Sequence, residues 1–319
     1  MKTSRFNPAT QQGSQPVRVL QHNLTHGLEN VSPGFLAELK RLIAEEGLQP
    51  GICYRISDCP IVGTKGSGSP SVWSNDKKIE LPETFLSFMW SVTYAVIVVF
   101  GEMILKPAQN GRTVKPNARS LRQADRLLEY ATSLITNYSR WDIDSLPNPE
   151  FYDAQDDPYV EQTNGAFVPA VVFVLCHEVA HVALGHCNLD NLGVYVSSMD
   201  SKLDETAADF YAIDTMTKHS ADGNFQRPEA TGIIAGLASL LMLSKEVRED
   251  RHPDTDERLI AGVRRLGLPD ESLLWGLGTA AIKLWDSHYN RQLVWPEESD
   301  SYKALFNEMA DKTIKRVDR

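Results

Sequence analysis

Apolar side chains recur at helical spacing in several stretches of the chain. In residues 120–136, for example, Leu121, Leu128 and Ile135 belong to a single apolar stripe, which is typical of an amphipathic helix. Similar patterns or continuous apolar runs predict helices over residues 33–46, 120–136, 169–186, 229–246 and 272–285. Residues 137–161 are rich in Pro, Asn and acidic side chains, which favours a surface loop. We therefore expect an α+β protein that is predominantly helical and has a small sheet.

Residues 85–101 contain no charged side chain, so the stretch approaches the composition of a membrane-spanning helix. A spanning helix needs about 20 predominantly apolar residues. This stretch is shorter and includes Ser87 and Ser91, while the acidic residues Glu83 and Glu102 flank it. Because acidic residues are poor anchors at a membrane surface, we expect a buried core helix. A membrane-anchored protein is the alternative.

Residues 62–71, with the sequence VGTKGSGSPS, have the composition of a flexible connector. We therefore expect a boundary nearby, with an N-terminal region of unassigned role at residues 1–75 and a larger domain at residues 76–319. No repeat is visible at a period of twenty to fifty residues, which excludes solenoids and propellers.

The composition is that of a folded, soluble protein. Of the 319 residues, 42% are hydrophobic and 23% are charged, and the formal net charge is -10. Proteins that bind nucleic acid normally carry a basic stripe that neutralises phosphates, so we expect no nucleic acid partner. The first ten residues are not followed by an apolar stretch, as a secretory signal would require, and the 4 Cys residues are too few for a disulfide framework. We expect a cytoplasmic location.

The strongest chemical signal is the sequence HEVAH at residues 177–181. Side chains four positions apart lie on the same face of a helix, so His177 and His181 can bind one metal ion while Glu178 is offset toward an open coordination position. Zinc in such a site lowers the pKa of bound water to about 7, and a neighbouring carboxylate can accept the proton when water attacks a carbonyl. The motif predicts metal-assisted hydrolysis with Glu178 as the general base.

A catalytic zinc site needs a third protein ligand, for which the sequence offers Glu205 and His186. Glu205 and Asp209 share a helix face, so Glu205 can bind zinc while Asp209 accepts a hydrogen bond from a ligating imidazole. A continuous helix would turn His186 about 140° away from His181, although Gly185 could allow the last turn to unwind. We choose Glu205, and we expect His186 to cap the helix or to support a ligand.

The segments HEVAH at 177–181, ETAAD at 205–209 and RHPDTDERL at 251–259 resemble the HExxH, ExxxD and HPxxxxR elements of the HtpX and CAAX-prenyl endopeptidase group. The chain looks closer still to the Lit-type phage-exclusion peptidases, because it has a single strongly apolar helix before the motif. The resemblance implies that His252 and Arg258 bind the peptide carbonyl or the developing oxyanion.

Motif and resemblance together predict a zinc-dependent endopeptidase of the gluzincin type with a zincin-like fold. Its expected substrate is an intracellular protein or peptide, and the resemblance implies a role in phage defence. A membrane partner is not expected. The alternative from a different class is a non-catalytic interaction protein stabilised by zinc, although such a site would tend to have four protein ligands, usually including Cys.

Overall fold

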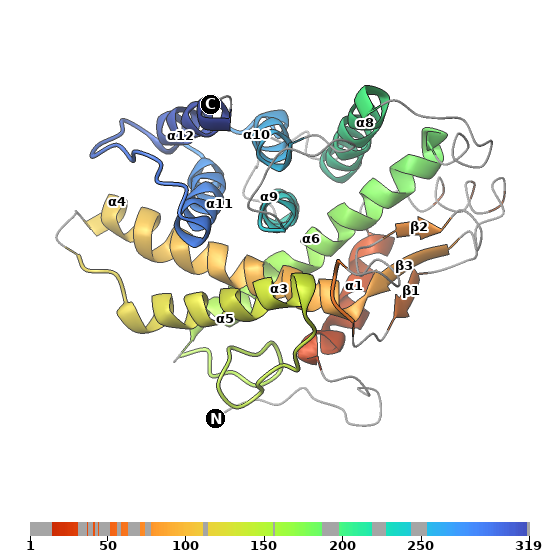
Figure 1. The fold of residues 1–319 in the computed structure, drawn as a ribbon, viewed down its shortest axis with the longest axis horizontal. Helices are drawn as coiled ribbons and strands as arrows, with labels where there is room; N and C mark the ends of the chain where they lie inside the picture. Colours follow the sequence, from red (N-terminus) through yellow and green to blue (C-terminus); the bar gives the residue numbers. More distant parts are fainter. Residues whose placement is uncertain are drawn as a thin grey trace.

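The computed structural model describes residues 15–30, 37, 41, 44, 52–55, 59–62, 71–73, 78–110, 114–155, 157–186, 198–218, 228–243 and 254–317. The fold is predominantly helical, as predicted (Figure 1). Most of the helix predicted at residues 33–46 lies outside the described residues, as do most of the predicted connector at 62–71 and the proposed boundary.

Helix α3 (Glu83–Val99) is buried along its whole length, as expected for a helix that is apolar on every side. It continues into a π-helical segment, η2 (Phe100–Leu105), and then into α4 (Lys106–Asn110). Helix α5 (Ala118–Thr136) packs against α3, and the side chain of Asn117 caps it by accepting hydrogen bonds from the backbone N–H groups of Arg119 and Ser120. The predicted core helix and the predicted amphipathic helix are both confirmed.

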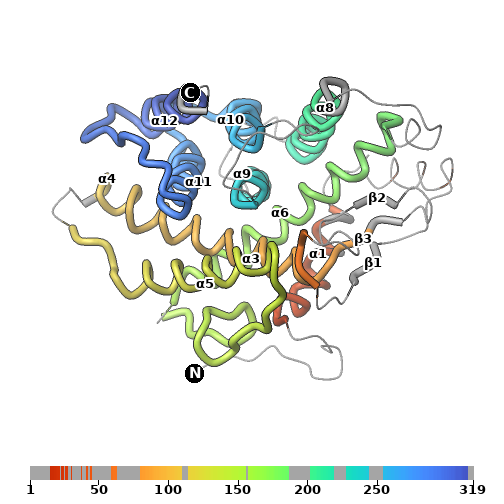
Figure 2. The backbone as a smooth tube through the Cα atoms, in the orientation of Figure 1, coloured from red at the N-terminus to blue at the C-terminus, as the bar shows by residue number. Residues whose placement is uncertain are grey.

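Helix α6 (Pro158–Ala183) begins eleven residues before the predicted start at Pro169. The prediction took Pro169 as the first helical residue, and that was wrong because the helix accommodates this proline in its interior. Asp157 instead caps the helix, accepting a hydrogen bond from the N–H of Tyr159. The loop predicted at 137–161 is therefore shorter at its C-terminal end, and α6 is long enough to run from the interior to the side of the molecule where α8 lies (Figure 2).

Helix α9 (Pro228–Leu241) lies very close to α6, because two glycines face it. A Cβ atom on Gly232 would stand 2.3 Å from Cβ of Pro169, and one on Gly236 would stand 2.8 Å from a ring carbon of Phe173. These separations are far below van der Waals contact, so only glycine allows this approach. The position of α6 in the fold therefore depends on the absence of side chains at both points.

Helices α8 to α12 lie on one side of α3 and α6 (Figure 1). Helices α8 (Ser198–Thr217) and α9 both pack on α6, and α10 (Thr255–Arg265) packs on α8 and α9. Helix α11 (Leu273–Tyr289) agrees with the prediction for 272–285 apart from a longer C-terminus, and α12 (Tyr302–Val317) packs against it. This arrangement brings the HEVAH end of α6 beside the acidic face of α8.

Three short strands form a sheet in the order β1-β3-β2. Strand β1 (Ile52–Arg55) runs parallel to β3 (Lys78–Pro82), with Ile52 opposite Ile79, and β2 (Ser71–Trp73) runs antiparallel to β3. Strand β3 leads directly into α3, so the sheet is joined to the core helix without a linker.

The N-terminal elements η1 (Pro16–Leu20) and α1 (Gln21–Glu29) pack against the helical core. Arg18 forms an ion pair of 2.7 Å with Glu83, and the side chain of Gln15 donates a hydrogen bond to the backbone carbonyl of Ser139. Part of the predicted N-terminal region thus contacts the same core as the larger domain, and the division at residue 75 stays a prediction.

In the part of the chain that the structure describes, two helical stretches, 83–109 and 158–183, are long and apolar enough to cross a membrane by length and composition. Most of the apolar part of each stretch is buried inside the fold, and core helices of soluble proteins meet the same criteria. The expectation that a membrane is not a partner stays a prediction.

Replacing Gly232 by alanine should lower the free energy of unfolding by about 1–3 kcal/mol, because its Cβ would collide with Pro169 and with the backbone of Ala170. The matched control is Gly165→Ala on α6, where a Cβ has no neighbour within 4 Å. This control should stabilise the protein by about 0.5–1 kcal/mol, because alanine favours a helix more than glycine does. Urea denaturation of both variants measures the difference, and equal stabilities would contradict the close approach of α6 and α9.

Candidate metal centre

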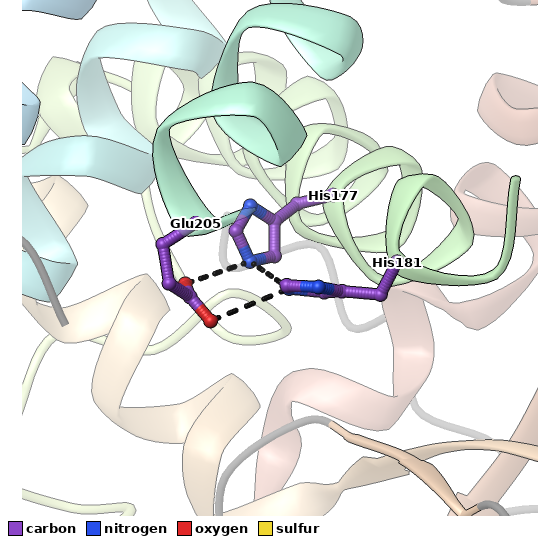
Figure 3. A group of neighbouring side chains, drawn as sticks. All are labelled: His177, His181 and Glu205. Carbon is purple, nitrogen blue, oxygen red and sulfur yellow. Dashed lines mark hydrogen bonds and ion pairs between the residues drawn. The ribbon is translucent and has the colours of Figure 1, made fainter. Parts of the chain in front are cut away.

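The two histidines of HEVAH lie on one face of α6 near its C-terminal end (Figure 3). Their Nε2 atoms are 3.1 Å apart, and the planes of the two rings are nearly perpendicular. The helical spacing of four residues produces this convergence, as predicted from the sequence. Both side chains are mostly buried, with 10% of His177 and 17% of His181 exposed.

Glu205 reaches the same point from α8 (Figure 3). Its Oε2 atom lies 3.3 Å from Nε2 of His177, and its Oε1 atom lies 3.4 Å from Nε2 of His181. Among the described residues, His177, His181 and Glu205 are the group whose ligand atoms are close enough to hold one metal ion. The structure therefore brings together the three ligands that were predicted.

The separations of these atoms fit a tetrahedral metal site. Ligands about 2.0–2.1 Å from a zinc ion at the corners of a tetrahedron stand about 3.3–3.4 Å from each other. The two Nε2 atoms, 3.1 Å apart, are close to that edge length, and so is the nearest Glu205 oxygen to each of them, Oε2 at 3.3 Å from His177 and Oε1 at 3.4 Å from His181. Two imidazole nitrogens and one carboxylate oxygen are also a usual ligand set for catalytic zinc, which leaves the fourth corner open.

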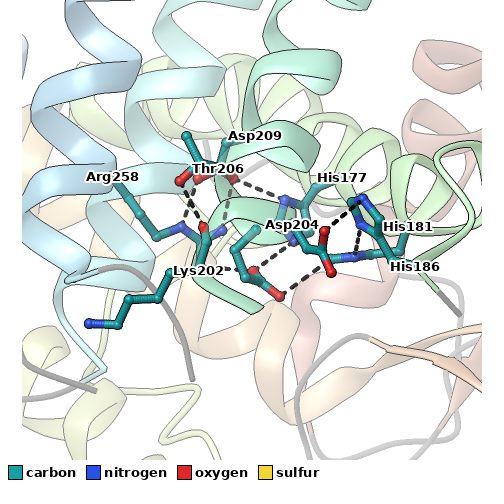
Figure 4. Close-up of polar contacts among 9 residues, drawn as sticks. His177, His181, His186, Lys202, Asp204, Thr206, Asp209 and Arg258 are labelled. Atoms are coloured by element: carbon teal, nitrogen blue, oxygen red, sulfur yellow. Dashed lines mark hydrogen bonds and ion pairs between the residues drawn. The ribbon is translucent and has the colours of Figure 1, made fainter. Parts of the chain in front are cut away.

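Asp209 lies behind His177, with its Oδ1 atom 2.9 Å from Nδ1 of the imidazole. Arg258 of α10 in turn donates two hydrogen bonds to Asp209, from Nε at 2.7 Å and from Nη2 at 2.8 Å (Figure 4). The same guanidinium approaches Glu205, with Nη1 3.5 Å from Oε2. Arg258 thus binds two neighbouring carboxylates of the cluster, and its predicted contact with the substrate or the oxyanion stays a prediction.

The charges in this cluster favour a bound cation. Burial has the largest single effect on the pKa of His177 and lowers it, but Asp209 and Glu205 outweigh burial and raise the pKa to about 9. Burial and the neighbouring His177 lower the pKa of His181 to about 4. The carboxylates thus favour positive charge beside His177, which a proton or a metal ion can supply.

Arg258 does not remove this preference. Burial alone would raise the pKa of Asp209, yet Arg258 and His177 lower it overall, so the carboxylate is ionised at neutral pH. The single positive charge of Arg258 offsets only one of the two carboxylates, Asp209 and Glu205. The cluster therefore retains excess negative charge when the imidazoles of His177 and His181 are neutral.

His186 does not extend α6, because the helix ends before it. Leu184 is the C-cap, and Gly185 has a φ of 77°, a left-handed conformation that glycine adopts without strain. The chain turns there and brings the His186 ring beside His181, with the two Nδ1 atoms 3.0 Å apart. His186 therefore contacts His181 on the side opposite the converging Nε2 atoms, and Asp204 lies 3.3 Å from Nε2 of His186.

The other predicted catalytic residues are described in part. Glu178 is half-buried, whereas its neighbours His177 and Val179 are buried. Burial lowers the pKa of Arg258, but the neighbouring carboxylates, Asp209 most strongly, raise it overall. Glu178 is one of the carboxylates that raise this pKa, so it lies on the same side of the protein as the cluster. His252 lies outside the described residues.

Sequence reasoning did not assign two of these contacts. The sequence patterns assigned no role to Asp204, and Arg258 was assigned to the substrate through a resemblance alone. Gly185 was the available signal for the first contact, because a glycine after the last predicted turn indicates a helix end. For Arg258 the distance of 49 residues from Asp209 left no local signal.

Comparison with known proteins gives one match. Residues 79–278 match the model of the Peptidase U49 family. No curated protein and no solved structure matches the chain. The match covers more than half of the chain and includes α6 and α8, the helices that carry His177, His181 and Glu205, which supports a peptidase. The likeness to the HtpX group stays a prediction.

Replacing Glu205 by alanine should weaken zinc binding by more than about 100-fold, because partners that only orient a ligand are already worth about 10–100-fold. The control is Asp214→Ala, since Asp214 lies on the same helix but pairs with Arg265 on the surface. Zinc content is measured by mass spectrometry after dialysis against a mild chelator. Equal zinc retention in the two variants would contradict the ligand assignment.

Proposed function

We propose that this chain, which belongs to the Peptidase U49 family, is a zinc-dependent endopeptidase of the gluzincin type. The observation that carries the proposal is the convergence of His177, His181 and Glu205, whose ligand atoms lie close enough to hold one metal ion. The helices that supply them form the centre of what we propose to be a zincin-like α+β domain. The proposed substrate is an intracellular protein.

His177 and His181 would hold the ion through Nε2, and Glu205 through a carboxylate oxygen. Zinc in such a site supplies a water of lowered pKa and polarises the carbonyl of the scissile peptide bond. Zinc is favoured over magnesium or calcium, which prefer sites made only of oxygen ligands. The three ligands leave one coordination position for water or substrate, whereas a purely structural zinc site would be closed by a fourth protein ligand.

Glu178 is the proposed general base. It follows His177 directly on α6, so its carboxylate is offset from the face that carries the two imidazoles. It is also the more accessible residue in a run of buried neighbours, as a group that must meet water and substrate requires. In the proposed reaction Glu178 accepts a proton from the attacking water and delivers it to the leaving amine nitrogen.

Asp209 and Arg258 are proposed to orient the first imidazole. A carboxylate beside Nδ1 of His177 fixes the tautomer in which Nδ1 carries the proton and Nε2 is free for the metal. Arg258 keeps that carboxylate ionised and in place through two hydrogen bonds. His252 is proposed to bind the carbonyl oxygen of the substrate, by resemblance to the HPxxxxR element.

The proposal includes a cytoplasmic location and a role in phage defence. The first rests on the cysteine content, because 4 Cys residues are too few for a disulfide framework, and the second rests on the resemblance to the Lit-type peptidases. The charge balance of -10 also supports a partner that is a protein rather than a nucleic acid.

Replacing Glu178 by glutamine should abolish nearly all hydrolysis and leave zinc binding unchanged. The amide can still hold a water molecule but cannot accept its proton, and general base catalysis contributes about 10²–10⁴-fold. Hydrolysis is measured with a fluorescence-quenched peptide library and with proteome-derived peptides, and zinc is quantified in the same samples. A variant that retains its zinc and cleaves as fast as the wild type would rule out Glu178 as the base.

A lysine in place of Arg258 separates its two roles. Lysine keeps the charge but cannot make the paired hydrogen bonds, so Arg258→Lys should weaken zinc binding by about 10-fold through Asp209. Asp209→Asn should give a similar loss, and combining the two substitutions should add little. Normal zinc affinity with a lowered kcat would instead favour the predicted contact of Arg258 with the oxyanion.

A further inference from the structure

His181 has a second partner on the side that faces away from the metal ligands. The Nδ1 atoms of His181 and His186 are 3.0 Å apart, and the two rings meet edge to face with centroids 5.2 Å apart. Nε2 of His186 lies 3.3 Å from Oδ1 of Asp204. A continuous row of contacts therefore runs from Asp204 through His186 to His181 (Figure 4).

Both ends of this row come from the helices that form the metal centre. His186 follows the C-terminus of α6, where hydrogen bonds from the N–H of Leu184 to Ala180 and of Gly185 to Val182 close the last turn. Asp204 lies on α8 immediately before Glu205. Helix α8 thus contacts both sides of the His181 imidazole, directly through Glu205 and indirectly through Asp204.

When a metal binds Nε2 of His181, the neutral imidazoles of His181 and His186 can carry their protons in only one arrangement. If Nε2 of His181 binds a metal, its Nδ1 must carry the proton and must donate to Nδ1 of His186. Nδ1 of His186 is then an acceptor, so the His186 proton is on Nε2. That N–H faces the carboxylate of Asp204, which accepts the hydrogen bond. Each contact in the row is thereby a donor meeting an acceptor.

We propose that His186 and Asp204 are positioning residues for the metal ligand His181. His186 fixes the tautomer and the ring orientation of His181, and Asp204 fixes those of His186. The inference rests on the proposed function, because it assumes that Nε2 of His181 binds the metal. His181 then has a support corresponding to that of His177, with an imidazole and a carboxylate in place of Asp209 and Arg258.

The supports of the two ligands differ in their exposure. The side chain of Asp209 is 4% exposed and that of Arg258 is 8% exposed, whereas the values for His186 and Asp204 are 14% and 32%. Water weakens charge interactions that reach the surface. Loss of Asp204 should therefore have a smaller effect than loss of His186.

The test uses three substitutions of His186 in the full chain. Asparagine places an amide oxygen near the position of Nδ1 and can still accept from His181, whereas glutamine places its amide near the position of Nε2 and leaves His181 without its acceptor. Alanine removes both groups. We expect zinc affinity, measured by competition with a chelator, to fall about 10–100-fold for His186→Ala and His186→Gln and to be largely retained in His186→Asn. Asp204→Ala should lose at most about 10-fold.

Two further measurements separate positioning from a structural role. The absorption spectrum of the cobalt(II)-substituted protein reports the geometry of the site, and it should change in the alanine and glutamine variants but not in His186→Asn. The melting temperature of each metal-free variant reports folding, and it should match that of the wild type. His288→Asn on α11 and Asp214→Ala on α8 are the controls for loss of a histidine and of an acid.

The outcomes distinguish this inference from the proposed function. Wild-type zinc affinity and cobalt spectra in all His186 variants, together with metal loss in Glu205→Ala, would overturn the positioning role alone. An equal loss of affinity in all three His186 variants, accompanied by lower melting temperatures, would also overturn it in favour of a structural role. Zinc retention in Glu205→Ala with loss in every His186 variant would make His186 a ligand and would overturn both proposals.

Discussion

The buried ion pair between Arg258 and Asp209 is the interaction on which the geometry of the site depends. Charges removed from water are stable only when they are paired and hydrogen bonded, and this pair has two short hydrogen bonds. It joins α10 to α8, and Asp209 in turn contacts His177 of α6. Because Glu205 lies one helical turn before Asp209, fixing one carboxylate also directs the other toward the imidazoles.

Apolar packing places α6 where this polar cluster can form. Gly232 and Gly236 let α9 approach Pro169 and Phe173 closely, so the middle of α6 is held by contacts that tolerate no added side chain. His177 and His181 lie about one to three turns farther along the same helix. A site on a rigid helix holds its ligands more accurately than one on a loop, which suits the convergence of His177, His181 and Glu205 at one point.

The two imidazoles have a common chemical requirement and different surroundings. Each must present an unprotonated Nε2 to the centre and therefore needs an acceptor at Nδ1. Nδ1 of His177 faces a buried carboxylate that is paired with Arg258. For His181 the proposed acceptor is the imidazole of His186, which the turn at Gly185 brings back against the helix. The end of α6 thus contributes to the site in two ways. Its helical spacing aligns His177 with His181, and the turn that ends it places His186 beside His181.

The sequence alone predicted the features that depend on local spacing. These are the helical class, the shared face of His177 and His181, and that of Glu205 and Asp209, since a helix places residues four apart together whatever surrounds it. It misplaced the start of α6, because proline is common at the first position of a helix and uncommon inside one, whereas α6 carries Pro169 in its interior. The tertiary structure alone decided which carboxylate meets which base. The contacts of Arg258 with Asp209 and of Asp204 with His186 join elements that are far apart in the sequence or separated by a turn, so no local spacing predicts them. For Arg258 and Asp209 the physical reason is burial, because charges removed from water must find a partner.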